Sequence, residues 1–478
     1  MLVSLNLQCA LSTKVLPVSN IPRLVYLLLT ISGGEGAETL PSNISLIIDT
    51  SDSMRIRLVS DNQFSDLVMK GLVQEVMTDG IPAYQISSIP EDQMVRFPRR
   101  IDFVSQALNT MSEYLRPQDY FSLIAFAGWA HCIIPSISGR ERARLLQVAR
   151  ELEYLRLGEG TNMSEGIALA YEELQRQAGK SSSGRMILLT DGHTLKVSEC
   201  YEWAKKAHEH GFILTTMGIG AEFNEDLLIP LADQTSGNAY YIETPNQIPD
   251  ALSKELGAAM HISYHNVEVK VLISSDVELR KVHRVLPELG DFDHGPNLGG
   301  EKPLSSSYSL LIGDYDPGVP VGLLLELIVP PWPSGNHRLA QALLTWENPS
   351  AEVGLLNNAH SGLPARENLR QEIDVQFAKI ETARLDEYVM NIVEKVGAFR
   401  MGTLALEAAQ TAVKNKSNEE KSSATVRLRQ AATQLLDLGE QSLADSMLSQ
   451  ADALEQSGVI SPEATKKLRY ETRRLSQH

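Results

Sequence analysis

An aspartate and two serines alternate along a short loop near residue 50. Asp49, Ser51 and Ser53 occupy every second position of the segment DTSDS, which directly follows a run of apolar residues. In an extended turn, side chains at alternate positions point to the same side, so these three groups can meet at one spot. Oxygen donors of this kind suit Mg²⁺, which prefers octahedral oxygen coordination and keeps several waters. By itself the pattern is weak, because acids and serines are common in loops.

Two later loops carry further oxygen donors. The segment GEGTN, residues 158–162, stands directly before an expected helix, and the segment LLTDG, residues 188–192, ends a buried strand with an acid. The carboxyl ends of neighbouring parallel strands meet at one edge of a sheet, where ligands of such sheets bind. The sequence therefore predicts that three loops supply oxygen atoms to the same edge.

This ordered set resembles the von Willebrand factor type A (VWA) family, in which D-x-S-x-S is followed by a distant threonine and a distant aspartate. The resemblance covers residues 42–260, and the layout of the whole chain looks like that of soluble bacterial VWA proteins. It implies a metal-ion-dependent adhesion site with five ligands, direct or through water: Asp49, Ser51, Ser53, Thr161 and Asp191. It also implies that Mg²⁺, with Mn²⁺ as the alternative, keeps one coordination position open to an aspartate or glutamate of a partner protein.

One residue departs from the family pattern. Asp52 replaces the glycine that is often found at this position of the loop. Aspartate tolerates left-handed backbone better than most residues, so the loop can keep its shape. The additional negative charge could alter the affinity for the metal or the partner.

Apolar strands alternate with amphipathic helices around these loops. Strands are expected at residues 44–48, 121–126, 132–134, 186–190, 213–219 and 239–242, and helices at 101–115, 140–155, 164–177, 198–210, 224–234 and 247–260. This alternation predicts an α/β fold, a doubly wound parallel sheet of Rossmann-like type with helices on both faces.

Different patterns precede and follow this block. Residues 3–11 alternate between apolar and polar, and short strand-like segments separated by Gly and Pro resume after residue 261. We expect the N-terminal strands (1–40) to complete a β-sandwich formed by residues 261–373, with the α/β domain (41–260) inserted between them. Residues 374–478 have helical spacing and predict a helical hairpin or bundle, with turns near 415–421 and 458–462.

A long insertion, residues 55–100, separates the D-x-S-x-S loop from the helix that usually follows it closely. It carries an expected helix at 62–77, an Asp79-Gly80 turn and an end rich in arginine. Long connections at a ligand-binding edge are often functional. Two interpretations stay open: a lid beside the metal, with Asp61 or Asp79 occupying its open position in the resting state, and a solvated decoration on the side of the sheet.

The composition excludes several classes of protein. The chain has 478 residues, of which 43% are apolar and 22% charged, as in folded multidomain proteins. The net charge of −17 repels a phosphate backbone, so nucleic acid is not an expected partner. Three scattered cysteines, Cys9, Cys132 and Cys200, favour neither a disulfide framework nor a thiolate zinc site. The apolar run at 25–31 is too short to span a membrane, and we expect a cytoplasmic protein.

The sequence predicts a binding protein rather than an enzyme. It has neither a G-x-S-x-G elbow nor a P-loop, and Ser51 stands where an aspartyl-phosphate phosphatase has its second acid. We therefore expect a Mg²⁺-dependent adaptor or scaffold that captures an acidic residue of a protein. By analogy with soluble bacterial VWA proteins, an ATPase, a kinase or a defence-system component is the expected partner. The alternatives are a metal-assisted hydrolase, which would need a general base near Asp49, and a cell-surface adhesin.

Overall fold

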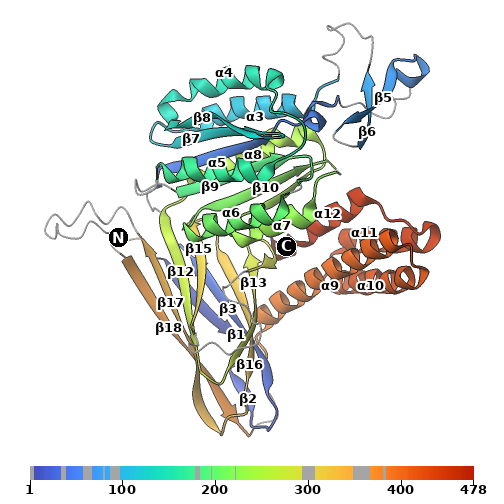
Figure 1. Cartoon of the computed structure of the whole chain (residues 1–478). Helices are drawn as coiled ribbons and strands as arrows, with labels where there is room; N and C mark the ends of the chain where they lie inside the picture. The colour runs from blue at the N-terminus through green and yellow to red at the C-terminus, as the bar shows by residue number, and fades with distance from the viewer. Residues whose placement is uncertain are drawn as a thin grey trace, which may run out of the picture. The chain divides into compact units, whose positions relative to one another are not determined.

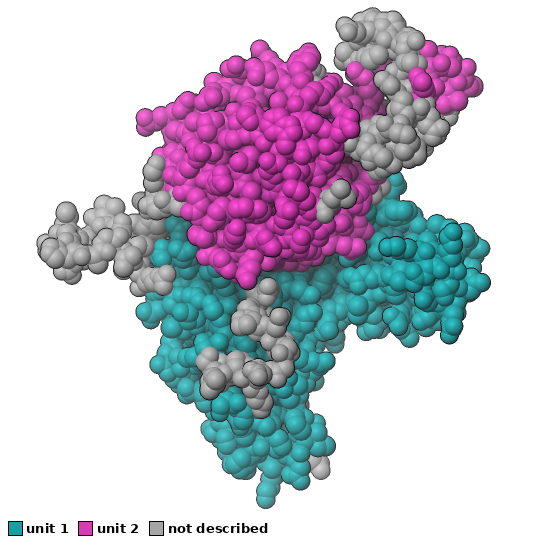
Figure 2. Space-filling model, viewed as in Figure 1, with its two compact units in different colours: residues 1–38, 263–478 teal, residues 39–262 magenta. Residues whose placement is uncertain are grey.

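The chain divides into two compact units, residues 1–38 together with 263–478, and residues 39–262 (Figure 2). The computed structural model describes residues 5–33, 39–57, 67–78, 81–86, 97–177, 183–194, 196–220, 222–292, 307–347, 366–379 and 384–477. Each unit has its own hydrophobic core, as a chain too long for a single core requires.

The unit formed by residues 39–262 is built on a six-stranded sheet in the order β11-β10-β9-β4-β7-β8. Its strands are β4 (Ser42–Asp49), β7 (Tyr120–Phe126), β8 (Ala130–Ser138), β9 (Ser183–Thr190), β10 (Ile213–Ile219) and β11 (Ala239–Ile242). All neighbours are parallel except β8, which pairs antiparallel with β7. The predicted parallel sheet thus has one antiparallel edge, because the short turn 127–129 can join only antiparallel strands.

Helices cover both faces of this sheet, which confirms the predicted doubly wound α/β fold (Figure 1). On one face, α3 (Arg100–Tyr114), α4 (Ala143–Glu151) and α8 (Ile248–Met260) share a core with Leu46 and Ile48 of β4. The other face carries α5 (Met163–Gln175), α6 (Val197–Glu209) and α7 (Glu225–Gln234). Gly166 of α5 faces Ile47, whose side chain points opposite to its neighbours in β4.

Two predicted helices differ from the structure. The one expected at 140–155 is split into η2 (Gly139–Glu141), α4 and η3 (Leu152–Tyr154). The helix prediction for residues 62–77 is wrong at its C-terminal end, where the chain forms β5 (Val73–Thr78). This strand pairs antiparallel with β6 (Ile81–Ile86). The β-branched residues of this segment favour a strand over a helix. Asp61 and Asp79 lie outside the described residues, so the lid hypothesis stays a prediction.

The other unit contains two five-stranded sheets packed face to face. One sheet has the order β1-β3-β16-β13-β14, with β1 (Asn6–Leu11), β3 (Arg23–Ser32), β16 (Val321–Val329), β13 (Glu278–Leu286) and β14 (Gly290–Asp291). The second has the order β15-β12-β17-β18-β2, with β15 (Ser307–Tyr315), β12 (Tyr264–Ile273), β17 (Gly335–Glu347), β18 (Arg366–Ala378) and β2 (Val15–Pro17). Leu27, Val269 and Leu325 meet in the core between them. Because β3 pairs with β16, the N-terminal strands complete a later sheet as predicted.

The C-terminal segment forms four helices, α9 (Glu387–Asn415), α10 (Asn418–Asp437), α11 (Gln441–Ser457) and α12 (Pro462–Thr472). The predicted turns after α9 and α11 are confirmed, whereas the turn at Gly439, where φ is +81°, was not predicted. Apolar residues of these helices share a core with Leu28, Val285 and Leu324 of the first sheet. The apolar stripe of the tail is therefore buried within its own unit.

Two of the exclusions drawn from composition can be compared with the structure. Cys9, Cys132 and Cys200 form no disulfide, and burial raises the pKa of each thiol to about 12. They are therefore protonated and poor metal ligands. In the part of the chain that the structure describes, we find no helix with the length and apolar character needed to cross a membrane.

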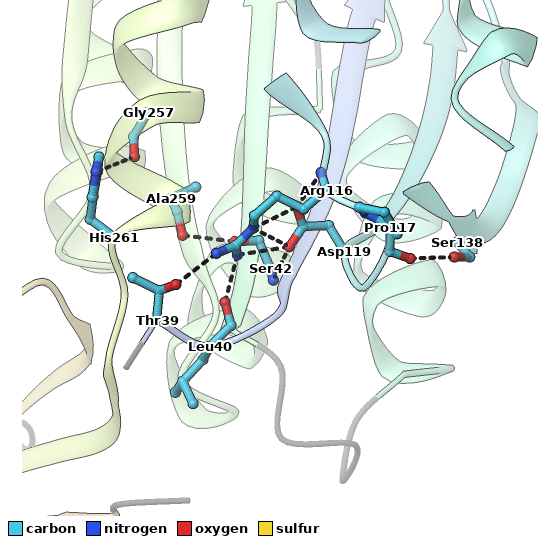
Figure 3. Close-up of polar contacts among 10 residues, drawn as sticks. All are labelled: Thr39, Leu40, Ser42, Arg116, Pro117, Asp119, Ser138, Gly257, Ala259 and His261. Carbon is cyan, nitrogen blue, oxygen red and sulfur yellow. Dashed lines mark hydrogen bonds and ion pairs between the residues drawn. The ribbon is translucent and has the colours of Figure 1, made fainter. Parts of the chain in front are cut away.

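Arg116 and Asp119 fix the segment that leads into β4 (Figure 3). The buried carboxylate of Asp119 accepts the backbone N–H of Ser42 at 2.9 Å, and the Arg116 guanidinium donates to the carbonyl oxygen of Leu40 at 2.7 Å. The Ser42 hydroxyl donates to the carbonyl of Ala259, near the end of α8, at 2.8 Å. The first strand and the last helix of the unit are thus tied together.

A buried glutamate fastens α8 to the sheet. Glu255 accepts hydrogen bonds from Arg185 and Thr215 at 2.8 Å each, from Asn238 at 2.8 Å and from the Tyr240 hydroxyl at 2.6 Å. Burial by itself would raise the pKa of Glu255, but the Arg185 charge and the three other donors hold that pKa below its ordinary value. The carboxylate is therefore charged and satisfied in the folded unit.

We predict that Glu255→Gln lowers the free energy of unfolding by roughly 3 kcal/mol near neutral pH, because Arg185 is left buried without its counter-charge. The pKa of Glu255 is lower in the folded than in the unfolded chain, so its contribution is present above about pH 4 and lost as the pH falls further. Urea unfolding at several pH values should show the gap between variant and wild type narrowing in acid.

Arg429→Gln is the matched control for this measurement. It breaks ion pairs with Asp452 and Glu455 that are largely exposed, so it should leave the free energy of unfolding nearly unchanged. A gap between Glu255→Gln and wild type that stays constant from neutral to acidic pH would contradict the assigned role of the carboxylate.

Candidate metal-binding site

The carboxyl end of β7 supports two of the predicted loops. The carbonyl oxygen of Phe126 accepts both the backbone N–H of Thr50, at 2.8 Å, and the Thr50 hydroxyl, at 3.1 Å. The next carbonyl, that of Ala127, accepts the N–H of Asn162 at 2.6 Å. The D-x-S-x-S loop and the loop before α5 are therefore attached to the same short stretch of backbone, which lies at the edge that sequence analysis predicted.

Asp49 is completely buried at the end of β4. Its Oδ1 accepts the backbone N–H of Ser51 at 2.9 Å, which closes the turn of the loop, and its Oδ2 accepts the hydroxyl of Thr190 at 2.6 Å. The Thr190 hydroxyl also accepts the N–H of Gly192 at 3.1 Å. Thr190 thus links the ends of β4 and β9. The sequence analysis missed this residue, although a hydroxyl before the acid at a strand end is a visible signal.

A chain of hydroxyls connects the first loop to Asp191. The Oγ atoms of Ser51 and Ser53 lie 3.0 Å apart, and Ser53 Oγ donates to Asp191 Oδ1 at 2.8 Å. Asp191 is also buried, at the end of β9. Four of the five predicted ligands, Asp49, Ser51, Ser53 and Asp191, therefore lie together although they are distant in sequence.

Thr161, the fifth predicted ligand, lies beside Gly192. A Cβ atom built on Gly192 would be 3.3 Å from the Thr161 hydroxyl oxygen and 3.7 Å from Asp49 Oδ2. Because Gly192 has no side chain, there is space between two oxygen atoms that could bind a metal ion. Sequence analysis did not assign this role to Gly192.

The charge of the site is unfavourable without a cation. Burial and the nearby charges of Asp49 and Glu222 raise the pKa of Asp191 to about 7, against the opposing effects of Arg100 and of the Ser53 hydrogen bond. Asp191 Oδ2 accepts no hydrogen bond from the described residues, and Arg100 Nη1 lies 3.0 Å from it. A buried carboxylate oxygen without a donor fits a position facing a cation.

Hydroxyl oxygens would have to complete any metal site here. Among the residues that the structure describes, no group of three His, Cys, Asp or Glu side chains could hold a metal ion. The edge instead offers the carboxylates of Asp49 and Asp191 with the hydroxyls of Ser51, Ser53 and Thr161. An all-oxygen set with two negative charges fits Mg²⁺ or Mn²⁺ better than zinc or copper.

Comparison with known families assigns two parts of the chain. The family model "von Willebrand factor type A domain" matches residues 87–254, and the model "Sll0103-like, C-terminal alpha-helical domain" matches residues 387–478. The chain therefore contains a VWA domain, followed by a helical domain of the Sll0103-like type. A VWA domain indicates, at the general level, a role in protein interaction or adhesion.

Two bacterial relatives share part of the sequence. The Escherichia coli protein YfbK is 29% identical over 163 residues, which are 33% of this chain and 28% of that protein. The Synechocystis protein sll0103 is 23% identical over 327 residues, or 65% of this chain and 74% of that protein. This chain therefore spans less than a third of the first relative and about three quarters of the second, and neither name states an activity.

Two solved structures resemble nearly the whole chain. The von Willebrand factor type A protein from Catenulispora acidiphila has a TM-score of 0.72 at 14% identity, covering 98% of this chain and 96% of that one. The ArnB paralog VWA2 from Sulfolobus acidocaldarius has a TM-score of 0.53 at 15% identity, covering 99% of each chain. At such identities the likeness shows the fold alone, including its β-sheet and helical parts.

We predict that Gly192→Ala weakens Mg²⁺ binding by about tenfold, equivalent to about 1.4 kcal/mol. The added methyl group would occupy the space between the Thr161 hydroxyl and Asp49 Oδ2. Isothermal titration calorimetry with Mg²⁺ measures the change in Kd. The control is Gly257→Ala in α8, where a Cβ would meet no atom within 4 Å and binding should be unaffected. Equal Mg²⁺ affinities of Gly192→Ala and wild type would show that this space does not hold the ion.

Proposed function

We propose that the VWA domain binds Mg²⁺, or alternatively Mn²⁺, through Asp49, Ser51, Ser53, Thr161 and Asp191, directly or through water. The bound ion would capture an aspartate or glutamate of a partner protein. The observation that carries this proposal is the burial of two carboxylates, Asp49 and Asp191, with a chain of hydroxyls between the loops that carry them.

The donor set supports capture of a carboxylate. Two carboxylates balance the two charges of the ion, and neutral hydroxyls fill other positions without reducing its charge further. An ion held in this way stays electrophilic and can accept one more anionic oxygen from outside. Backbone bonds that fix the loops, such as that from Thr50 to Phe126, support a site organised before the partner arrives.

Binding is preferred to hydrolysis because Asp49 is already engaged on both oxygens. Oδ1 accepts the N–H of Ser51 and Oδ2 accepts the hydroxyl of Thr190. These bonds stabilise the charged carboxylate in one orientation, which suits a fixed ligand better than a base that takes a proton from water. We therefore propose an adaptor or scaffold without catalysis. An ATPase, a kinase or a defence-system component stays the predicted partner, and the cytoplasm the predicted location.

We predict that Asp49→Ala abolishes Mg²⁺ binding, because the ion loses one of its two counter-charges. Calorimetric titration of the full chain should give a Mg²⁺ isotherm for wild type and none for the variant, and Mg²⁺ should raise the melting temperature of wild type alone. Asp437→Ala, which removes an exposed acid at the end of α10, is the matched control and should behave as wild type. Identical isotherms for wild type and Asp49→Ala would refute the metal site.

The same variant tests the capture of a partner. Pull-down from the lysate of the source organism uses wild type and Asp49→Ala, each with Mg²⁺ and with EDTA. We expect a partner that only wild type with Mg²⁺ retains. Recovery of the same proteins in all four samples would contradict metal-dependent capture. The β-sandwich and the helical domain would then be the next candidates for the binding surface.

A further inference from the structure

We infer that Arg100 is an internal cation that competes with the metal ion for Asp191 and so sets the metal affinity of the site. This inference rests on the proposed metal-dependent function. It starts from one contact: Arg100 Nη1 lies 3.0 Å from Asp191 Oδ2, with side-chain exposures of 14% and 0%. Among the described residues, none donates a hydrogen bond of normal geometry to this carboxylate oxygen.

The guanidinium lies among three loops at the carboxyl edge of the sheet. Besides its ion pair with Asp191, Arg100 Nη1 donates to the carbonyl oxygen of Ser53 at 3.1 Å. On a further side lies Gly220, after β10, where an added Cβ would be 3.4 Å from Arg100 Nη2. Arg100 therefore contacts two loops that carry proposed metal ligands.

The backbone of Arg100 is held in place independently of its side chain. Arg100 is the first residue of α3, and the start of this helix is capped by Asp102, which accepts the N–H of Arg99 at 2.7 Å. Arg57 and Arg99 form a β-bridge that joins the two ends of the insertion. The long Arg100 side chain can therefore leave Asp191 without unfolding the helix that carries it.

The ion pair between Arg100 and Asp191 is of a kind that a metal ion can replace. The contact between Arg100 and Asp191 is short but lacks the alignment of a hydrogen bond, so the arginine offsets the charge of Oδ2 without saturating it. An arginine is always protonated, so its charge persists at any pH at which the protein is folded. A divalent cation would bring twice this charge, and Asp191 together with Asp49 would hold it.

Two consequences follow for the metal equilibrium. Without metal, Arg100 lowers the cost of burying two carboxylates and stabilises the fold. With metal, its positive charge either opposes the ion or must be displaced, so binding is weaker than the ligands alone would allow. The site would thus release its metal more readily than a VWA site without such an arginine.

The test compares Mg²⁺ and Mn²⁺ binding to the full chain for wild type, Arg100→Gln, Arg100→Lys and Arg99→Gln. We expect Arg100→Gln to lower the Kd for Mg²⁺ by about tenfold or more, because it removes a unit positive charge that lies 3.0 Å from Oδ2 of the proposed ligand Asp191. Arg100→Lys, which keeps the charge, should stay closer to wild type. Arg99→Gln removes the same charge from a residue that pairs with Asp102 instead, and should change the Kd much less.

A second measurement separates competition from a merely structural role. In EDTA, Arg100→Gln should melt below wild type, because Asp191 loses its counter-charge. In saturating Mg²⁺ this difference in melting temperature should disappear or change sign. A variant that is equally destabilised with and without Mg²⁺, or that binds Mg²⁺ no more tightly than wild type while circular dichroism shows a folded chain, overturns the inference.

The outcomes also distinguish this inference from the proposed function. If wild type and Arg100→Gln both fail to bind Mg²⁺ and Mn²⁺, the metal site is refuted and the inference falls with it. If wild type binds metal and Arg100→Gln binds no more tightly, the metal site stands and only the competition is refuted. Binding by Arg100→Gln alone would support both.

Discussion

The arrangement at the sheet edge depends on the burial of two negative charges, those of Asp49 and Asp191. A buried carboxylate is costly unless it is paired or hydrogen-bonded, and here burial with the neighbouring charge raises the pKa of Asp191 to about 7. The hydroxyls of Thr190 and Ser53 and the charge of Arg100 offset part of this cost. The same unfavourable charge that the fold must tolerate gives the site its proposed affinity for a divalent cation.

The sheet supplies the stiffness that such a site needs. Glu255 ties the last helix to β9, β10 and the segment around β11, and Asp119, in the loop before β7, binds the first residue of β4. These polar contacts lie away from the carboxyl edge of the sheet, whereas the proposed ligands lie at the last residue of β4 and on the loops that follow the strands. Scaffold and site are thus separate, which allows loops to change while the fold is kept.

The elements that could be predicted are those with a clear local period. The alternation of apolar strands and helices predicted the α/β unit, and the strict alternation at the N-terminus predicted β1, which pairs with β3 in a sheet that later strands complete. The antiparallel direction of β8, the turn at Gly439 and the hairpin β5-β6 were not predicted. In each case a short turn or a few β-branched residues decided the local structure. The hydrophobic period is read over a longer window of residues, in which such short features have little weight.

The sequence alone determined which residue types could bind a cation and in what order they occur: Asp49, Ser51 and Ser53, then Thr161, then Asp191. Only the tertiary structure decided which further residues act on them. Thr190 reaches Asp49 across 141 positions and Arg100 reaches Ser53 across 47, while Gly192 leaves the space beside Thr161. Periods of two and of 3.6 residues describe neighbours along one element, but contacts between loops depend on strand order, which is set by the packing of the whole sheet.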